Sequence, residues 1–454
     1  MEEQKNKMGE KPVLSLLISM SLPMMLSMLV QSLYNIVDSM YVSWLGTEAL
    51  TAVSLAYPLQ NIVMAVSVGF GVGISSALSI SLGEKDQEKA NETATIGMAL
   101  TLIHCVIFVL FGSAVTRPFL QLFTSSPEVL ENACDYTYVV LCVSFGSLLQ
   151  ISLEKIYQGI GAMKTTMVLL ATGCIINIIL DPILIFGLLG FPAMGVRGAA
   201  IATVIGQIGA FVLYIVVYLH KNPGVTMHPR YLKLDWALIK RIYSVGIPSS
   251  LMLMMPSLLV SVLNGILAAF SDVYVAVLGV YFKLQTFIYM PANGMVQGMR
   301  PIIGFNYGAG QYGRVRQTIR YCLLGAAVLM LAGTVLSLAI PRGILQLFQA
   351  DAELLAAGET ALRIICLGFL VSTIGVVFSG VFEALGRGGE SLVISLLRQL
   401  VITVPLGFVL SRVMGAAGIW AAFPLSELTA SLVALILLKR YQNGKFFPWG
   451  RVDH

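Results

Sequence analysis

A single aspartate, Asp38, stands inside the first long apolar run of the chain. Gln31, Tyr34 and Asn35 precede it by seven, four and three residues, so a helix would place all four side chains on one face. An ionised carboxylate costs several kcal/mol inside a membrane, and is a candidate functional group by default. The chemistry that this face favours is the reversible binding of a proton or a hard cation.

A second polar group follows in the runs near residues 165–187 and 196–219. Asp181 follows Asn177 by four residues, and Gln207 follows Thr203 by four, so each pair shares a helical face. If these faces meet Asp38, the oxygen atoms of Asp38, Asn177, Asp181 and Thr203 could share one proton or hold Na⁺. The alternative is that both aspartates lie at helix ends near the outer headgroups. The sequence leaves H⁺ and Na⁺ open, and we expect no other metal and no cofactor.

Composition indicates which elements must position these groups. Of 454 residues, 57% are hydrophobic and only 11% are charged, whereas soluble domains carry about 25% charged residues. Runs of about 20 apolar residues cross a bilayer as helices. We therefore predict an all-α polytopic membrane protein with twelve transmembrane helices and lipid as its surroundings, and the net charge of +5 is no nucleic-acid signal. The spans lie near residues 13–40, 49–80, 93–115, 130–153, 165–187, 196–219, 242–270, 273–299, 317–340, 354–382, 391–411 and 416–438.

Basic residues predict the orientation of these spans. Alternate loops and both termini together carry twenty Lys and Arg residues, whereas the opposite loops hold only Arg117, Arg197, Arg342 and Arg412. Because basic residues concentrate on the cytoplasmic side, we expect both termini of a multi-pass plasma-membrane protein to be cytoplasmic.

The two halves of the chain repeat each other in a constant register. The matched pairs include Pro23 and Pro248, Gln60 and Gln285, Gly69 and Gly294, Gly73 and Gly298, and residues 120–123 and 345–348. A five-residue deletion then shifts the register, so that Gly187 matches Gly407. Six spans per copy give a parallel repeat, with two pseudo-twofold-related six-helix bundles. The predicted divisions are an N-terminal lobe at 1–220, a cytoplasmic linker at 221–240, a C-terminal lobe at 241–440 and a cytoplasmic tail at 441–454.

Five segments together resemble the multidrug and toxic compound extrusion (MATE) family. They are 31–38, 177–182, 195–203, 300–309 and 418–427. The resemblance implies an antiporter that exports lipophilic, often cationic drugs or toxic compounds in exchange for H⁺ (or Na⁺) by alternating access. Asp38 and Asp181 resemble the DinF-like bacterial branch, and the absence of an acidic residue from 242–270 departs from the branch that carries a Glu there.

The same resemblance suggests that the first span bends at Pro23 when the acidic cluster takes its proton; the alternative is that Pro23 is a static kink. A polar strip on the second span could complete a substrate cavity in the N-terminal lobe. The expected cavity residues are Gln31, Tyr34, Asn35, Tyr57, Gln60, Asn61 and Gln207.

Four charges fall within the spans of the C-terminal lobe: Lys283, Arg363, Arg398 and Glu427. Their roles stay open, although Arg398 and Glu427 are expected to form a buried ion pair because such charges rarely stand alone. Glu154 and Lys155 stand at a predicted cytoplasmic span end and are expected to be boundary residues.

Other classes of protein fit less well. An enzyme is not expected, because the chain contains neither an HExxH nor a GxSxG motif. A channel would need a continuous polar pore. A lipid-linked oligosaccharide flippase of the same superfamily stays as the alternative, although such proteins tend to carry basic cavity residues that the N-terminal spans lack. We expect a monomer with small lipophilic or cationic substrates.

Overall fold

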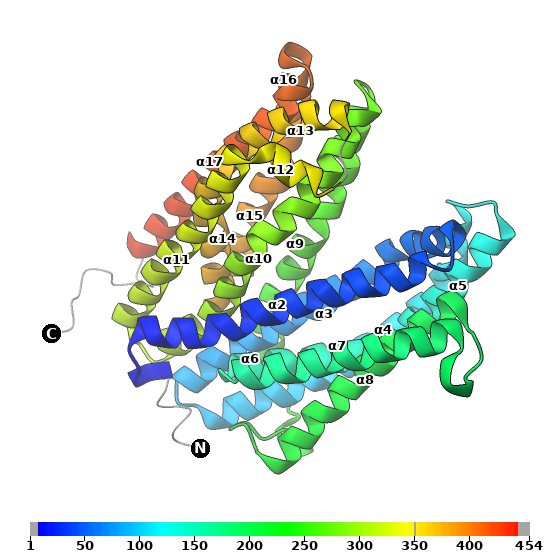
Figure 1. Ribbon diagram of the computed structural model, residues 1–454. Coiled ribbons are helices and arrows are strands. Elements are labelled where there is room, and N and C mark those ends of the chain that lie inside the picture. Colours follow the sequence, from blue (N-terminus) through cyan, green and yellow to red (C-terminus); the bar gives the residue numbers. More distant parts are fainter. Residues whose placement is uncertain (1–7, 349–350, 444–454) are drawn as a thin grey trace. The chain divides into compact units, whose positions relative to one another are not determined.

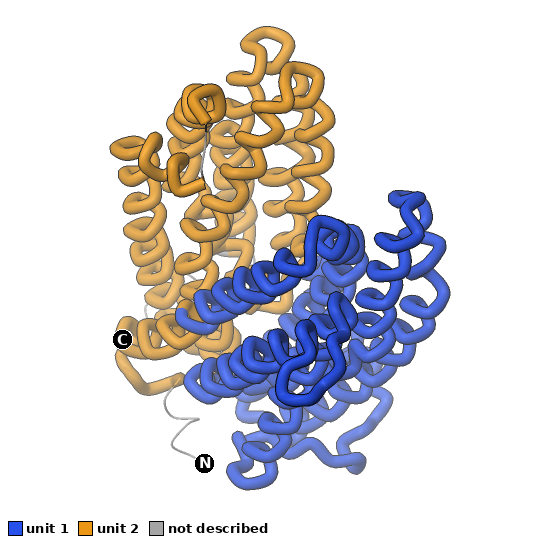
Figure 2. The backbone as a smooth tube through the Cα atoms, turned by 45° about the vertical axis from the view of Figure 1, so that its right-hand side comes forward, with its two compact units in different colours: residues 1–5, 26–250 blue, residues 6–25, 251–454 orange. Residues whose placement is uncertain are grey.

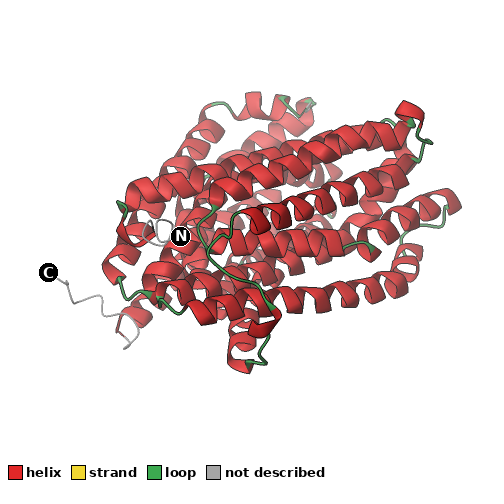
Figure 3. Cartoon of the chain, turned by 90° about the horizontal axis from the view of Figure 1, so that it is seen from below, coloured by secondary structure: helices red, strands yellow, loops and turns green. Residues whose placement is uncertain are grey.

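The computed structural model describes residues 8–348 and 351–443, and within these residues helices joined by loops and turns make up the chain, with no strand (Figures 1 and 3). Eleven of the described helices are long and apolar enough to cross a membrane, and a bent pair of shorter helices supplies a twelfth span. The predicted all-α membrane fold is therefore confirmed.

Seven α-helices lie between residues 13 and 220 of the described chain. They are α2 (Val13–Ser43), α3 (Thr47–Gly83), α4 (Gln87–Gln121), α5 (Pro127–Cys142), α6 (Phe145–Gly159), α7 (Met163–Phe186) and α8 (Gly195–His220). The span expected at 130–153 is the bent pair, since α5 and α6 meet at an angle of 44°. Ser126 caps α5, where its hydroxyl accepts a hydrogen bond from the Val129 N–H.

The second half repeats this arrangement. It contains α9 (Trp236–Ala268), α10 (Asp272–Gly308), α11 (Tyr312–Ala339), α12 (Pro341–Gln346), α13 (Ala352–Ile365), α14 (Leu367–Ala384), α15 (Gly388–Leu396), η3 (Leu397–Val401), α16 (Thr403–Met414) and α17 (Ala416–Asn443). The span expected at 354–382 is divided at Cys366 into α13 and α14. The η3 segment is a π-helix inside the membrane span that runs from α15 to α16.

The described chain packs as two compact units (Figure 2). One contains residues 26–250; the other contains residues 8–25 together with residues 251–443. Each long first helix of a repeat copy is thus shared: α2 changes unit after Met25, and α9 changes unit after Ser250. Met25 and Ser250 are themselves counterparts in the repeat, so the packing follows its register. The lobes predicted at 1–220 and 241–440 stay a prediction. The packing units divide the chain differently at the first halves of α2 and α9, which each belong to the other unit.

Glycines explain why the first halves of α2 and α9 pack as they do. A Cβ atom added at Gly298 of α10 would lie 2.6 Å from the Ser21 backbone of α2. Its repeat partner, Gly73 of α3, leaves the same space for α9, because a Cβ there would lie 2.2 Å from the Ile242 carbonyl oxygen. Neither position can carry a side chain unless a backbone moves.

Replacement of glycine by alanine should change the stability in opposite directions at two positions of α10, one closely packed (Gly298) and one open (Gly279). Gly298→Ala should lower the thermal stability of the purified protein, with an overpacking cost of about 1–3 kcal/mol. Gly279→Ala is the control, since a Cβ at Gly279 would meet nothing within 4 Å. Alanine in an open helix position should stabilise by up to about 1 kcal/mol. Unfolding monitored by a thiol-reactive dye in detergent measures both, and equal melting temperatures would contradict the packing argument.

The linker at 221–240 is attached to α4. Lys233 forms ion pairs with Glu88 at 2.7 Å and with Glu92 at 2.8 Å, and the hydrogen bonds that it donates to these two carboxylates raise the pKa of Lys233. The Thr226 N–H donates to the Asn91 side chain at 2.8 Å. The linker is therefore held on the unit that contains α4. Residues 444–454 of the predicted tail lie outside the described residues.

Candidate transport site

Two neighbouring helices, α7 and α8, bring the second polar group together. The amide of Asn177 satisfies both neighbours when its Nδ2 donates to Asp181 Oδ2 at 3.1 Å and its Oδ1 accepts from the Thr203 N–H at 3.0 Å. Asn177, Asp181 and Thr203 are all buried. The predicted pair Asn177 and Asp181 and one member of the second pair, Thr203, therefore form one connected group across the two helices.

Glycines again set the distance between these helices. A Cβ added at Gly206 of α8 would lie 2.9 Å from the Gly173 carbonyl oxygen and 3.0 Å from Asn177 Cβ. A Cβ at Gly173 of α7 would lie 2.9 Å from Ala210 Cβ. The bridge through Asn177 depends on this approach, because a side chain at either glycine would push the helices apart.

Asp38 reaches the group from α2. Its carboxyl group lies within side-chain hydrogen-bonding range of Asp181. The buried Oδ1 atom of Asp38 has no hydrogen-bond partner among the described residues. Tyr34, one turn earlier on α2, is in hydrogen-bonding range of Thr203. Two facing carboxyl groups need a proton or a cation between them, because two bare negative charges repel strongly in a low dielectric.

An apolar cluster holds α2 against its neighbours at this point. Val42, one turn after Asp38, packs with Tyr136 of α5, Ile185 of α7 and Ala199 of α8. These side chains are all buried. Asp38 is consequently fixed on a packed helix and not on a loop, which is what a site of defined geometry requires.

The structure brings the four predicted coupling residues and Tyr34 together, but it separates some of the predicted cavity residues from them. Gln60 of α3 accepts a hydrogen bond from the Tyr136 hydroxyl at 3.4 Å. Tyr57 is 58% exposed, and Asn35 is also exposed. For Gln31, Asn61 and Gln207, all partly buried, the described residues offer no hydrogen bond to the acidic group.

Tyr136 is a member of this site that sequence reasoning missed. Its side chain is 3% exposed, and its hydroxyl donates a hydrogen bond to the Gln60 side chain. A tyrosine within an apolar run is the signal that could have found it, since buried tyrosine hydroxyls usually have a hydrogen-bond partner.

Glu154 and Lys155 lie near the end of α6, and their side chains are buried inside the protein; that they stand at a span boundary stays a prediction. They are 7% and 5% exposed, and their side chains form an ion pair at 3.3 Å. Gln158 donates to Glu154 at 2.8 Å and accepts from Lys155 at 2.9 Å, while Gln150 donates to Glu154 at 3.1 Å. The amides at four-residue spacing on α6 satisfy the charges, so the pair can be buried where hydropathy alone suggests a span end.

The charges of the second half fall into two kinds. The expected ion pair between Arg398 and Glu427 is confirmed, with Nε and Oε1 separated by 2.7 Å. Arg363 lies on α13, its side chain is 55% exposed, and it contacts Glu359 at 2.8 Å, so its position within a membrane span stays a prediction. Lys283 is exposed on α10.

The donor atoms at the facing carboxylates suit only a hard cation or a proton. They are carboxylate, amide and hydroxyl oxygens, which are the ligands of hard cations. The described residues contain no group of three or more His, Cys, Asp or Glu that could hold a metal ion. Asp38, Asp181, Thr203 and Asn177 are therefore the residues that would hold Na⁺, should Na⁺ be the ion.

Two repeated helical units with membrane-spanning helices, and a pair of facing carboxyl groups inside one of them, define a multi-pass membrane transporter. The chain belongs to the MatE family, whose model matches residues 23–183 and again residues 248–409. The two matched segments begin at Pro23 and Pro248, which are counterparts in the repeat, so each segment is one copy of it. The predicted membership of the MATE family is confirmed.

Named relatives match along almost the whole chain. A protein of Staphylococcus haemolyticus (strain JCSC1435), "Multidrug export protein MepA", is 27% identical over 443 residues, which are 97% of each chain. The solved structure "Crystal structure of MATE in the straight conformation" has a TM-score of 0.89 at 26% identity and covers 96% of this chain and 97% of that one. "Crystal structure of MATE in the bent conformation" has a TM-score of 0.87 at 27% identity, covering 95% and 97%.

Proposed function

We propose that this protein exports small lipophilic, often cationic compounds across the plasma membrane in exchange for H⁺ or Na⁺, by alternating access. The observation that carries the proposal is the facing pair Asp38 and Asp181, bridged to Thr203 through Asn177. Relatives named as multidrug export proteins support the export of drugs. The protein needs no cofactor, both termini are cytoplasmic, and it works as a monomer.

The carboxylate pair offers a physical basis for exchange. When a proton or Na⁺ enters the pair from outside, it neutralises the charge that a cationic substrate would otherwise balance. The ion and the substrate then compete for one negative site, so binding of the first favours release of the second. A difference of one pKa unit between two states of the protein changes their relative free energy by about 1.4 kcal/mol.

The distribution of charge favours cationic or neutral substrates at this site. The spans of the first half contain almost no Lys or Arg besides Lys155, which is paired with Glu154. A flippase for lipid-linked oligosaccharides must bind a pyrophosphate, for which basic side chains are the usual partners. Drug export therefore fits this unit better than lipid flipping.

Purified protein in liposomes tests the proposal. A fluorescent lipophilic cation should accumulate against its own gradient when a pH gradient or a Na⁺ gradient is imposed alone, and the effective gradient identifies the coupling ion. An ionophore that collapses that gradient should stop accumulation. If neither gradient drives the dye, or if dye moves equally well without any gradient, the antiport proposal is wrong.

A further inference from the structure

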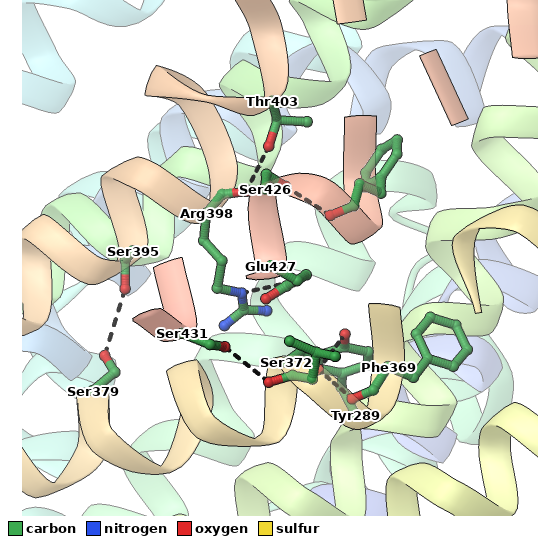
Figure 4. A network of polar contacts seen from close by, with 12 residues as sticks. Tyr289, Phe369, Ser372, Ser379, Ser395, Arg398, Thr403, Ser426, Glu427 and Ser431 are labelled. Atoms are coloured by element: carbon green, nitrogen blue, oxygen red, sulfur yellow. Dashed lines mark hydrogen bonds and ion pairs between the residues drawn. The ribbon is translucent and has the colours of Figure 1, made fainter. Parts of the chain in front are cut away.

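A second buried charge site lies in the other unit, where the span from α15 to α16 packs against α17 (Figure 4). Arg398 of η3 and Glu427 of α17 face each other there, with side chains 13% and 11% exposed. The proposed export mechanism uses neither residue. Burying two charges costs several kcal/mol each unless geometry and further hydrogen bonds offset it.

The backbone at this site is irregular, which turns Arg398 out of the regular helical register. Residues Leu397–Val401 are π-helical, and the Ile402 N–H donates to the Leu397 carbonyl, five residues back. The Thr403 hydroxyl donates to the Arg398 carbonyl at 2.6 Å and thereby satisfies one of the displaced backbone groups. π-Helical turns are rare and occur frequently at functional sites.

The ion pair is formed through a single hydrogen bond, so it does not use the two terminal nitrogens of the guanidinium group. Arg398 Nε bonds Glu427 Oε1 at 2.7 Å. Within the described residues, the two terminal nitrogens of Arg398 have no hydrogen-bond partner, and the buried Oε2 atom of Glu427 has none either. A structural Arg–carboxylate pair gains most when two parallel hydrogen bonds form. We call the two terminal nitrogens of Arg398 the fork, because their spacing matches the two oxygens of a carboxylate; Glu427 does not occupy this fork.

An aromatic ring lies beside the guanidinium group, and further rings pack nearby in the same unit. The guanidinium carbon of Arg398 lies 5.8 Å from the ring centroid of Tyr289, whose hydroxyl is held by Ser372 at 2.8 Å. Tyr281 packs edge-to-face on Phe423 of α17, with centroids 5.3 Å apart. An anion that binds the fork would therefore place its apolar part against aromatic rings.

From these contacts we propose that Arg398 binds the carboxylate of an aromatic substrate that also carries a positive charge. The substrate class is thus amphipathic zwitterions, and the proposal rests on the export function proposed above. The positive charge matters because Glu427 already balances one charge of Arg398. A bare anion would bring a second negative charge into a low-dielectric site, whereas a zwitterion would bring none in net.

The repeat places this site on the counterparts of the helices that carry Asn177, Asp181 and Thr203. In the register that matches Gly187 with Gly407, Arg398 corresponds to Ile178 of α7, and Glu427 corresponds to Gln207 of α8. The two copies therefore use the same pair of helices for opposite charges. The acidic site of one unit suits a positive charge, and the guanidinium of the other suits a carboxylate.

Rhodamine B and its ethyl ester test this proposal, because they share one aromatic cation and differ in a single carboxylate. Binding of each dye to purified protein is measured by fluorescence polarisation. Arg398→Lys, which keeps the charge opposite Glu427 but removes the fork, should weaken rhodamine B binding about tenfold, because it removes charge-assisted hydrogen bonds to the dye's carboxylate. Ester binding should change less than twofold. Arg342→Gln is the control, because it removes an arginine from the exposed pair with Glu359 and should affect neither dye.

Glu427→Gln separates a substrate site from a merely structural ion pair. Removal of the competing carboxylate should strengthen rhodamine B binding severalfold and leave the ester unchanged. In wild-type protein, tryptophan, an aromatic zwitterion, should displace rhodamine B, and tryptophanamide, which lacks the carboxylate, should not; this measurement needs no variant to fold. Equal loss of binding of both dyes in Arg398→Lys, or no displacement of rhodamine B by tryptophan, would overturn the proposal. Failure of the wild type to transport even the ester under any gradient would instead count against the export function.

Discussion

Asp38→Asn is expected to reduce gradient-driven efflux to the rate of protein-free vesicles while the protein stays folded. Asparagine keeps the volume of the side chain and can donate a hydrogen bond to Asp181, with which Asp38 is in contact. It cannot take up and release a proton, and it offers a cation no formal charge. If exchange depends on the carboxylate pair, half of the pair is then permanently neutral and the ion gradient has no site to act on.

Efflux from proteoliposomes measures this loss, and size-exclusion chromatography with thermal unfolding verifies folding. Asp135→Asn is the matched control, since Asp135 lies exposed on α5 of the same unit. The control should export at the wild-type rate. Wild-type export by Asp38→Asn would remove Asp38 from the coupling mechanism and leave Asp181 to be explained by helix packing alone.

Pro23→Ala is expected to preserve dye binding but to slow turnover strongly. Proline at this position of α2 has no N–H to donate to the Ser19 carbonyl, which weakens the helix locally. Pro23 lies two residues before the point at which α2 changes from one compact unit to the other. Alanine restores the hydrogen bond and favours a regular helix by up to about 3 kcal/mol. Such a change shifts an equilibrium between two shapes of the helix by roughly a hundredfold, so one state of the cycle would become rare.

Equilibrium binding and single-turnover efflux of the same dye separate the two effects. Pro118→Ala in α4 is the control, since Pro118 lies within a helix of the unit formed by residues 26–250 and is exposed. That variant should bind and export the dye as the wild type does. If Pro23→Ala also turns over normally, the proline is a static kink, and the element that switches lies elsewhere in the protein.

The linear pattern of the chain was sufficient for the membrane fold, the repeat and the family. Apolar runs long enough to span a bilayer are local properties, because a helix satisfies its own backbone within the lipid. The repeat is likewise found by comparing the chain with itself, and the two family matches begin at a matched pair of prolines, Pro23 and Pro248. The four-residue spacing of Asn177 and Asp181 placed them on one face, because helix geometry alone decides which positions are neighbours.

The tertiary structure decided what each polar residue contacts. Glu154 is buried because amides of its own helix surround it, whereas Arg363 is exposed although it stands in a similarly apolar stretch. The partnership of Tyr136 and Gln60 joins residues 76 positions apart. The open fork of Arg398 depends on a π-helical turn and on the place of Glu427 in another helix. Hydropathy reports the average cost of moving a segment from water into lipid, but the cost of burying one charge depends on the few atoms beside it, and only the packed helices bring those atoms together.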